Sequence, residues 1–393
     1  MRGTTFKRRL ASGSAAWAIQ LDAGHDLTGK RIRITRGGFD RQADAQAELA
    51  RLLQEAEDGL LVKPIPKTFG EFLSEWFQQH AVNQCSPKTT ERYRQLADSY
   101  ILPQLRDVQL RQLSALTLER LYGRLREAGG KEGRPLSVKT VRHVAGLVHV
   151  ALNTAVRWKV LKLNPASACV LPKLPPREAL ALDKTGLEWY LAAASGHPYL
   201  YPILVLAAAT GCRRGELLAV SWPDLDFTAG AVRISKSLEQ TRNGLRIKPP
   251  KHGKTRTLSL PAIAVQVLQG HRQEQDRRHQ LYGPDYRTDL DLVFANPEGD
   301  YLKPDTVTAE ACRIARKAGL PKGVSLHTLR HSHGSQLLAA GIPLPTVSKR
   351  LGHANPQVTA AIYSHGFAAD EVAAAQVWDS AMRSVISGTA SRQ

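Results

Sequence analysis

The sequence predicts a multidomain protein whose three parts differ in secondary structure. The N-terminal part alternates apolar and polar residues at strand period and then shows a helical stripe, which indicates a small α+β domain. The middle part repeats apolar residues at helical spacing, which indicates an all-α domain. The last part combines helical patterns with one short strand-rich region, so we expect a mainly α domain with a small antiparallel sheet. A length of 393 residues is typical of two or three domains.

The charge balance favours a polyanionic partner. The chain has 54 Lys and Arg against 35 Asp and Glu, which gives a net charge of +19. A basic excess of this size is typical of proteins that bind nucleic acids, although a merely soluble basic protein is an alternative. The excess is largest in residues 61–175, where 18 basic residues stand against 8 acidic ones. We therefore expect this segment to make most of the contacts with a nucleic acid.

The cysteines and the apolar runs indicate an intracellular protein. The four cysteines lie far apart and form no CxxC pair, which argues against a zinc ribbon or a disulfide framework. No apolar run approaches the roughly 18 residues of a membrane span, and the N-terminus lacks the apolar core of a signal peptide. We expect a soluble, cytoplasmic protein with no membrane partner.

The first predicted domain comprises residues 1–60. Residues 14–21 have a strand pattern, residues 22–29 are rich in turn formers, and residues 30–35 alternate basic and apolar side chains as a second strand. A helical stripe follows across residues 41–57. The basic side chains in and beside the second strand are DNA-binding candidates: Lys30, Arg31, Arg33 and Arg36. Protection of an exposed edge strand from aggregation is the alternative explanation for these charges.

The second predicted domain comprises residues 66–172 and four helices. Phe69, Phe72 and Trp76 belong to one apolar helix face, and Ser86 followed by Pro87 is typical of a helix start. The candidate phosphate or groove contacts of this domain are Lys88, Arg92, Arg94, Lys139, Arg142 and His143. For each of them a solvated helix face is an equally good explanation. The proline-rich residues 172–176 then predict an extended linker before a third domain at residues 178–393.

Four short motifs follow one another in this third domain. They are residues 210–216 (TGCRRGE), 327–331 (HTLRH), 351–353 (LGH) and 362–365 (IYSH). Together they supply two arginines, several histidines and one phenol. Arginine suits a phosphodiester because its planar fork binds two phosphate oxygens and stays charged, and a tyrosine oxygen can serve as a nucleophile. The motifs therefore indicate a site that binds and attacks a phosphodiester.

These four motifs in this order resemble the catalytic domain of the tyrosine recombinases, the phage-integrase family. The resemblance implies Arg213 and Arg330 as phosphate-binding residues, His327 and His353 as acid–base and hydrogen-bonding residues, and Tyr363 as the nucleophile. Glu216 is expected to orient an arginine by ion pairing, with an ordinary helix-start carboxylate as the alternative. His327 and Arg330 are three residues apart, so one helix face would present both. The family usually has Asp where Thr328 stands, so contacts behind the site are expected to differ.

A lysine is expected to complete the site. Residues 248–260 resemble the family's mobile β-hairpin, whose lysine protonates the leaving oxygen. Counting back from a strand at residues 256–260 selects Lys251. Lys254 and a merely solvated basic turn remain alternatives, because Ser259 stands where the family often has Pro.

The resemblance implies a function and a set of partners. We expect a site-specific recombinase that cleaves and rejoins duplex DNA through a 3′-phosphotyrosyl intermediate and integrates or excises a mobile element. Its expected partners are attachment-site DNA, three further copies of the chain in a tetramer, and accessory DNA-bending or excision factors. The source would be a bacterium or phage, with the protein at the nucleoid. A type IB topoisomerase and a non-catalytic DNA-binding regulator descended from recombinases are the rival functions.

The resemblance also implies domain roles and the absence of cofactors. Residues 1–60 would bind arm-type DNA, residues 66–172 core-type DNA, and residues 178–393 would carry out catalysis. No metal is expected, because the histidines occur without HExxH or a cysteine pair, and no P-loop indicates ATP. The apolar residues of segment 367–386 are expected to pack either on a neighbouring protomer or on the domain's own core.

Overall fold

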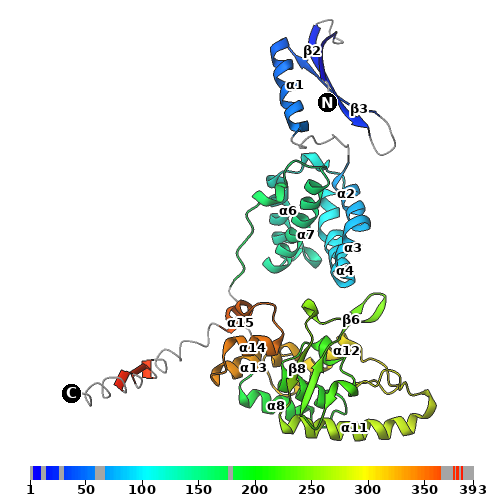
Figure 1. Ribbon diagram of the computed structural model, residues 1–393, viewed down its shortest axis with the longest axis vertical. Helices are drawn as coiled ribbons and strands as arrows, with labels where there is room; N and C mark the ends of the chain where they lie inside the picture. The colour runs from blue at the N-terminus through cyan, green and yellow to red at the C-terminus, as the bar shows by residue number, and fades with distance from the viewer. Residues whose placement is uncertain are drawn as a thin grey trace, which may run out of the picture. The chain divides into compact units, whose positions relative to one another are not determined.

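The computed structural model of the chain describes residues 3–9, 15–25, 31–57, 67–175 and 180–363, together with a few helical residues between 375 and 383. The chain divides into two compact units, Met1–Pro175 and Pro176–Gln393. The division falls inside the proline-rich stretch, whose described residues 171–175 have no regular secondary structure. Figure 1 shows the elements of each unit.

The first unit begins with a three-stranded antiparallel sheet. Its strands are β1 (Gly3–Arg9), β2 (Ala15–His25) and β3 (Arg31–Phe39), with β2 in the centre. Helix α1 (Gln42–Glu57) lies across one face of the sheet (Figure 1). The buried residues between sheet and helix are Ile19, Leu21, Ile34, Ala45 and Leu52. The predicted α+β domain is therefore confirmed.

Two details of this sheet differ from the prediction. Strand β1 was not expected, because Phe6 is its one large apolar residue and an apolar alternation is missing. The bend predicted over residues 22–29 is wrong as far as His25, since β2 continues to that residue through a register irregularity between Asp22 and His25. Residues 26–30 lie outside the described part of the structure.

The rest of the first unit consists of helices. One continuous helical segment comprises α2 (Phe69–Trp76), a π-helical turn η1 (Phe77–Ala81) and α3 (Val82–Gln84). A second comprises α4 (Pro87–Leu96), a π-helical turn η2 (Ala97–Ile101) and α5 (Leu102–Leu105). Helices α6 (Ala115–Ala128) and α7 (Val138–Arg157) follow. Short 3-10 turns are η3 (Leu110–Gln112), η4 (Lys131–Gly133) and η5 (Pro165–Ala168). The four predicted helices are confirmed.

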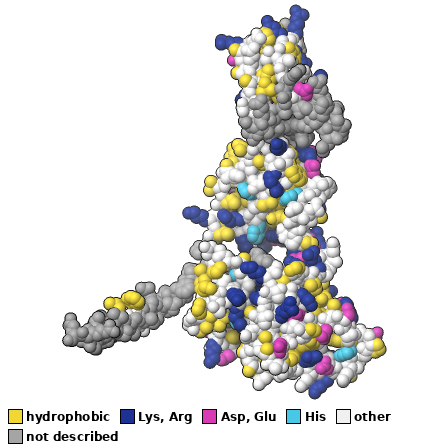
Figure 2. Space-filling view, viewed as in Figure 1, with side chains coloured by type: hydrophobic (Ala, Val, Ile, Leu, Met, Phe, Trp, Pro, Cys, Tyr) yellow, Lys and Arg dark blue, Asp and Glu magenta, His cyan; other side chains and the backbone are white. Residues whose placement is uncertain are grey.

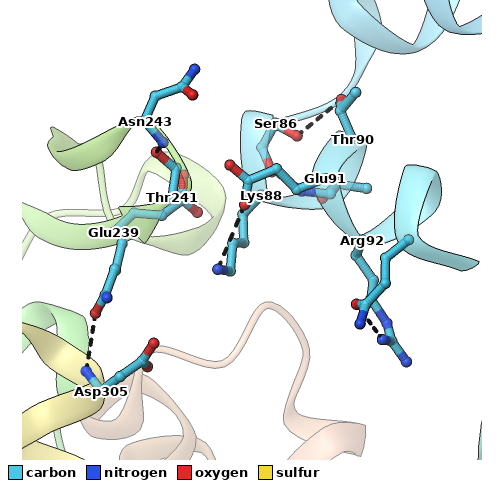
Figure 3. Close-up of polar contacts among 12 residues, drawn as sticks. Ser86, Lys88, Thr90, Glu91, Arg92, Glu239, Thr241, Asn243 and Asp305 are labelled. Carbon is cyan, nitrogen blue, oxygen red and sulfur yellow. Dashed lines mark hydrogen bonds and ion pairs between the residues drawn. The ribbon is translucent and has the colours of Figure 1, made fainter.

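Local sequence signals explain where these helices start. The side chains of Ser86, Ser114 and Ser137 each accept a hydrogen bond from the main-chain N–H three residues later. This bond satisfies one of the donors that a helix start leaves without an intrahelical partner. Figure 3 shows Ser86 at the start of α4, where the Thr90 hydroxyl also donates to its carbonyl at 3.3 Å. The expected apolar face of the first helix is buried, with Phe69, Phe72 and Trp76 fully inaccessible.

The second unit packs helices around two small antiparallel sheets. Its helices are α8 (Lys184–Ala194), α9 (Leu200–Thr210), α10 (Arg214–Leu217), α11 (Ala262–Tyr282), α12 (Pro304–Lys317), α13 (Leu326–Ala339), α14 (Leu344–Leu351) and α15 (Pro356–Tyr363). Its strands are β4 (Leu225–Asp226), β5 (Ala231–Ile234), β6 (Ser237–Thr241), β7 (Gly244–Lys248) and β8 (Arg256–Ser259). Its 3-10 turns are η6 (Trp222–Asp224), η7 (Lys251–Gly253) and η8 (Gly283–Asp285).

The core of the second unit is built around α9. Ile203, Leu204 and Leu206 have no exposed surface, and α9 contacts α13, α11 and α8. One sheet has the strand order β4-β5-β8, and β6 and β7 form a separate hairpin. The mainly α architecture with small antiparallel sheets is thus confirmed. Since the first motif starts at the last residue of α9 and the second lies on α13, the packing of these helices positions the predicted site.

None of the helices in the described ranges is long and apolar enough to cross a membrane.

Candidate active site

The first motif folds as a sharp turn between α9 and α10. Gly211 ends α9 in the left-handed conformation with a φ of +63°, which glycine adopts without the steric cost of a side chain. A Cβ at this position would also lie 2.6 Å from Leu351 Cδ2. Arg213 is the N-cap of α10, and Arg214 is its first helical residue.

Glu216 is the buried anion of this turn. Its side chain is 1% exposed and accepts three hydrogen bonds. Oε2 accepts from the Arg213 main-chain nitrogen at 3.0 Å, Oε1 accepts from Arg213 Nη1 at 2.8 Å, and Oε2 accepts from Arg256 Nη2 at 2.7 Å. Although burial raises the pKa of a carboxyl group, the hydrogen bonds and charges of Arg256 and Arg213 keep the pKa of Glu216 below its ordinary value. The carboxylate therefore stays ionised and holds both arginines.

The other end of the Arg213 fork reaches the third motif. Arg213 Nη2 donates to the carbonyl of Gly352 at 2.9 Å. Gly352 ends α14 with a φ of +67°, and a Cβ there would lie 2.9 Å from Arg256 Nη1. Arg213 is thus held at both nitrogens of its fork, while 25% of its side chain remains exposed.

The second predicted phosphate-binding arginine lies on α13. Arg330 is 3% exposed, and its Nη1 donates to the carbonyl of Gly211 at 2.7 Å. Burial, followed by the nearby charge of Arg213, lowers the pKa of Arg330 to about 10. It still carries its charge at neutral pH. Each of the two arginines is therefore hydrogen-bonded to the carbonyl of a left-handed glycine in a different motif.

The two predicted histidines lie in the same electrostatic environment. Partial burial, then the charges of Arg330 and Arg213, lower the pKa of His327, and the same causes lower the pKa of His353 to about 4. His353 Nδ1 lies 2.7 Å from the Thr359 hydroxyl at the next helix. His327 is the second residue of α13, so the predicted face shared with Arg330 is present. In the absence of an anion both imidazoles are neutral at neutral pH.

Three residues of this site were not expected. His331 lies edge-on to His327 with ring centroids 4.6 Å apart. Arg350 Nε donates to His333 Nε2 at 3.0 Å, so His333 Nδ1 carries the proton and donates to the Ala208 carbonyl at 2.8 Å. Burial, followed by the charge of Arg350, lowers the pKa of His333 to about 4. The position of Arg350 directly before the LGH motif was the one sequence signal for its role.

Thr328 has a structural role at the start of α13. Its hydroxyl oxygen accepts from the Ser325 main-chain nitrogen at 3.1 Å, and the Ser332 hydroxyl donates to its carbonyl at 3.0 Å. Ser332 in turn accepts from the Leu182 main-chain nitrogen at 2.7 Å. Thr328 thus belongs to the capping of α13, which is the work that an acidic side chain would also perform at this helical position.

Arg214 points away from its neighbour Arg213. Its Nη1 donates to the Pro304 carbonyl at 3.0 Å, to Asp305 Oδ1 at 3.1 Å and to the Thr308 hydroxyl at 2.6 Å. These acceptors all belong to the first five residues of α12. Arg214 therefore fastens α10 to α12 and is not part of the arginine and histidine cluster.

Residues 248–260, which supply the lysine candidates Lys251 and Lys254, begin at Lys248, the last residue of the β6–β7 hairpin. Lys248 forms an ion pair with the buried Glu239 of β6, whereas Lys251 and Lys254 are exposed. Lys251 begins the 3-10 turn η7, between β7 and β8, and is not itself on a strand of the hairpin. Figure 3 shows Glu239 in the hairpin, and the Gln240 side chain of the same strand accepts from the Asp305 nitrogen at 3.1 Å. The turn end of the hairpin is thereby fixed to α12.

Tyr363 is the last residue of α15. Its side chain and the rest of the fourth motif lie outside the described residues. The same holds for most of segment 367–386, so the two alternatives for its packing are not addressed by the structure. The described part of the structure thus brings together Arg213, Glu216, Arg330 and the histidines.

The DNA-binding candidates of the N-terminal sheet lie on different faces. Arg33 is exposed on β3. Arg36 forms an ion pair with Glu48 of α1, which Arg51 shares at 2.7 Å, so Arg36 lies on the helix side of the sheet. Lys30 and the side chain of Arg31 lie outside the described residues.

The candidates of the helical domain make weak or local contacts. Lys88 Nζ lies 3.7 Å from Glu91, and Arg92 Nη1 donates to Gln95 at 2.8 Å (Figure 3). The Arg94 guanidinium lies 4.9 Å from the Phe77 ring centroid, and Arg142 Nη1 donates to the Pro172 carbonyl at 3.1 Å. Lys139 and His143 are exposed. Figure 2 shows Lys and Arg side chains at several separate places on the visible face of this domain.

The described residues contain no group of three or more His, Cys, Asp or Glu arranged to hold a metal ion. The histidines of the cluster instead lie beside arginines. Two arginine forks, two neutral imidazoles and one buried carboxylate form a cationic surface. Such a surface can bind a phosphate and stabilise charge on its non-bridging oxygens.

Family models match three successive parts of the chain. The phage integrase family matches residues 187–369, the phage integrase N-terminal SAM-like domain matches residues 68–125, and the arm DNA-binding domain matches residues 5–56.

Bacterial proteins are similar over most of the chain. A tyrosine recombinase XerC-like protein of Caldanaerobacter subterraneus is 26% identical over an alignment of 373 positions, which covers 90% of this chain and 93% of the relative. An integrase of Streptomyces ambofaciens is 28% identical, and the alignment covers 88% of each chain.

Solved structures share the fold. The Tn1549 transposon integrase in complex with a circular intermediate DNA has a TM-score of 0.62 and 19% identity, over 74% of this chain and 93% of that chain. A lambda integrase tetramer bound to a Holliday junction has a TM-score of 0.57 and 18% identity, over 91% and 94% of the two chains.

The low pKa of His333 predicts a loss of stability in acid. The folded chain keeps His333 neutral down to about pH 4, whereas an ordinary histidine has a pKa of 6.5 and gains its proton earlier in the unfolded chain. The free energy of unfolding should therefore fall as the pH decreases from about 6.5 to 4. Urea titrations should show that the free energy of unfolding of His333→Gln depends less steeply on pH than that of the parent protein, by the equivalent of about one bound proton. A slope equal to that of the parent protein would contradict this assignment.

Proposed function

Because the chain belongs to the tyrosine recombinases, the phage-integrase family of site-specific DNA recombinases, we propose that Tyr363 is its nucleophile. The Tyr363 oxygen attacks a phosphodiester, forms a bond to phosphorus and displaces the 5′ oxygen of the next nucleotide. The product is a 3′-phosphotyrosyl bond to DNA. Attack by a 5′ hydroxyl from a second duplex then restores the DNA backbone and releases the tyrosine.

The observation that best supports this proposal is the joint anchoring of two arginines. Arg213 donates to Gly352 of the LGH motif, and Arg330 donates to Gly211 of the first motif. Motifs far apart in the sequence thus support one another within a single cluster. We assign Arg213 and Arg330 to the non-bridging oxygens, whose charge is met by donors that are already oriented.

The neutral histidines suit the proton transfers of this reaction. We assign His327 as the group that accepts the Tyr363 proton, because a neutral imidazole next to a bound phosphate becomes easier to protonate. His353 is assigned as a hydrogen-bond donor to a non-bridging oxygen. The Thr359 hydroxyl, 2.7 Å from Nδ1, can donate to that nitrogen and leave the proton on Nε2 for the phosphate.

Lys251 is proposed as the general acid. When the phosphorus–oxygen bond breaks, the leaving 5′ oxygen needs a proton, and an exposed lysine on a turn next to β8 can supply it. Lys248 is less suited because Glu239 already holds its ammonium group.

The reaction as proposed needs no cofactor. Two arginines and a lysine take the place of the metal ion that many nucleases use to stabilise the phosphate. The phosphotyrosyl bond keeps the energy of the phosphodiester, so rejoining needs no nucleotide hydrolysis.

We further propose that the chain acts on duplex attachment sites as a tetramer. The similar lambda integrase structure, a tetramer bound to a Holliday junction, supports this assembly. Residues 1–60 are assigned to arm-type sites, residues 66–172 to core-type sites and residues 178–393 to catalysis, with accessory DNA-bending or excision factors as further partners. The place of action would be the bacterial nucleoid.

The rival functions make different use of the same residues. A type IB topoisomerase would relax DNA as a monomer without exchanging strands between duplexes. A non-catalytic regulator would not need the anchored Arg213 and Arg330, so their mutual support favours an enzyme. Exchange of strands between two labelled duplexes distinguishes the recombinase from both rivals.

Replacing Tyr363 with Phe should abolish covalent attachment to DNA while binding is retained, because the substitution removes one oxygen atom. The measurement uses a nicked duplex that carries the end sequence of the mobile element and traps the covalent adduct on a denaturing gel. Tyr282→Phe, an exposed tyrosine on α11, is the matched control and should form the adduct normally. An adduct that persists in the Tyr363→Phe protein would refute the assignment.

Lys251→Ala should bind DNA normally but cleave it roughly 100-fold more slowly, the usual lower range for lost acid catalysis. A substrate with sulfur in place of the bridging 5′ oxygen has a leaving group that needs no proton, so it should restore nearly the parental rate. Lys254→Ala is the matched control and should cleave both substrates normally. Restoration by sulfur in Lys254→Ala, and not in Lys251→Ala, would move the role to Lys254.

A further inference from the structure

We propose that Arg256 is a positioning residue for DNA cleavage that sets the geometry of Arg213. The inference rests on the proposed function, because it assigns Arg213 to the scissile phosphate. Arg256 is the first residue of β8 and belongs to none of the four motifs. The Arg213 fork has two anchors, the Glu216 carboxylate and the Gly352 carbonyl. Arg256 bonds to the first anchor and to the main chain two residues before the second.

The first anchor is the Glu216 carboxylate. Glu216 Oε1 accepts from Arg213 Nη1 at 2.8 Å, and Oε2 accepts from Arg256 Nη2 at 2.7 Å. The side chains of Glu216 and Arg256 are 1% and 9% exposed. Removing one partner of a buried ion pair leaves an uncompensated charge, so the remaining side chain is expected to move. The position of Glu216, and through it of Arg213, therefore depends on Arg256.

The second anchor is the carbonyl of Gly352. Arg256 Nε donates to the carbonyl of Arg350 at 3.0 Å, two residues before the carbonyl that receives Arg213 Nη2. The Arg256 guanidinium also lies against Gly352, where an added Cβ would meet it at 2.9 Å. Arg256 therefore supports the turn that carries the Gly352 carbonyl as well as the Glu216 carboxylate.

A reciprocal contact strengthens this support. Arg350 Nη2 donates to the Ser259 carbonyl of β8 at 3.0 Å and to the Ala209 carbonyl of α9 at 2.9 Å. Arg256 therefore donates from β8 to the end of α14, and Arg350 donates from α14 back to β8. Bonds in both directions fix the separation between the strand and the LGH turn.

Only the arginine fork fits these acceptors. Arg256 reaches the Glu216 carboxylate, the Arg350 carbonyl and, at 3.5 Å, the Cys212 sulfur from one planar group. A lysine ammonium lacks this fixed arrangement of donors. Because Arg256 Nε and Nη2 are bonded to the Arg350 carbonyl and the Glu216 carboxylate, we assign Arg256 to act on the phosphate through Arg213.

The first test compares Arg256→Gln and Arg256→Lys with the full-length parent on nicked duplexes carrying the element's end sequence. A misplacement of about 1 Å in a catalytic group costs roughly 100-fold in rate, and this is the expected loss of the cleavage rate in Arg256→Gln. Arg256→Lys should lose less, because it keeps one charged bond to Glu216. Arg277→Gln, which removes an exposed arginine of α11, is the matched control and should cleave normally.

The second test separates positioning from general damage to the fold. A methylphosphonate at the scissile position is neutral and reduces the need for a phosphate-binding arginine, so Arg213→Ala should recover on it. The cleavage rate of Arg256→Gln on methylphosphonate should likewise come within a few-fold of the parent's rate. Bridging sulfur should not raise the rate of Arg256→Gln. The double variant Arg256→Gln with Glu216→Gln avoids an unpaired buried charge, and its rate should equal that of the slower single variant.

Several outcomes would overturn the inference. One is a cleavage rate in Arg256→Gln equal to that of the parent protein. Another is recovery of the Arg256→Gln rate with bridging sulfur and not with methylphosphonate. The third is a double variant whose loss of rate is the product of the two single losses. A loss on every substrate, accompanied by a large fall in melting temperature in the double variant as well, would assign Arg256 to folding alone. If the parent protein itself forms no adduct, the proposed function fails instead.

Discussion

The geometry of the candidate site depends on the buried carboxylate of Glu216. It accepts hydrogen bonds from Arg213 and Arg256, which come from different elements of the chain. A carboxylate that is 1% exposed is stable in the ionised form only with such partners. Because the Glu216 carboxylate needs Arg256 as a partner, the turn after α9 is held against β8. Because Arg256 and Arg350 then join β8 to the end of α14, the LGH motif is placed as well.

The same arrangement determines the electrostatics of the site. Arg213 and Arg256 are both bonded to the Glu216 carboxylate, and Arg330 is bonded to the carbonyl of Gly211, two residues before Arg213. Burial, together with the positive charges of Arg330 and Arg213, lowers the pKa values of His327 and His353, so both imidazoles are neutral at neutral pH. A bound phosphate would offset the effect of the arginine charges, since a nearby anion favours the protonated imidazole. The site is therefore preorganised for an anion in both its arginines and its histidines.

The sequence predicted the helices of the middle domain and the cluster of motif residues, because apolar spacing, N-cap serines and motif order are local signals. It did not predict β1, whose composition lacks apolar alternation, or the roles of Arg256, Arg350 and His333. The partners of these residues are largely main-chain carbonyls, such as those of Arg350, Ala209 and Ala208, and carbonyls leave no mark in a sequence. Arg36 was likewise chosen by its charge, whereas its pairing with Glu48 is a tertiary contact.

A structure of the Tyr363→Phe protein bound to its attachment-site DNA would test the central claim most directly. The account predicts that Arg213 and Arg330 both lie within about 3 Å of the non-bridging oxygens of the scissile phosphate. Glu216 should still accept from Arg213 and Arg256, as it does without DNA. A phosphate that displaces Glu216 from Arg213, or that lies out of reach of Arg330, would contradict the account.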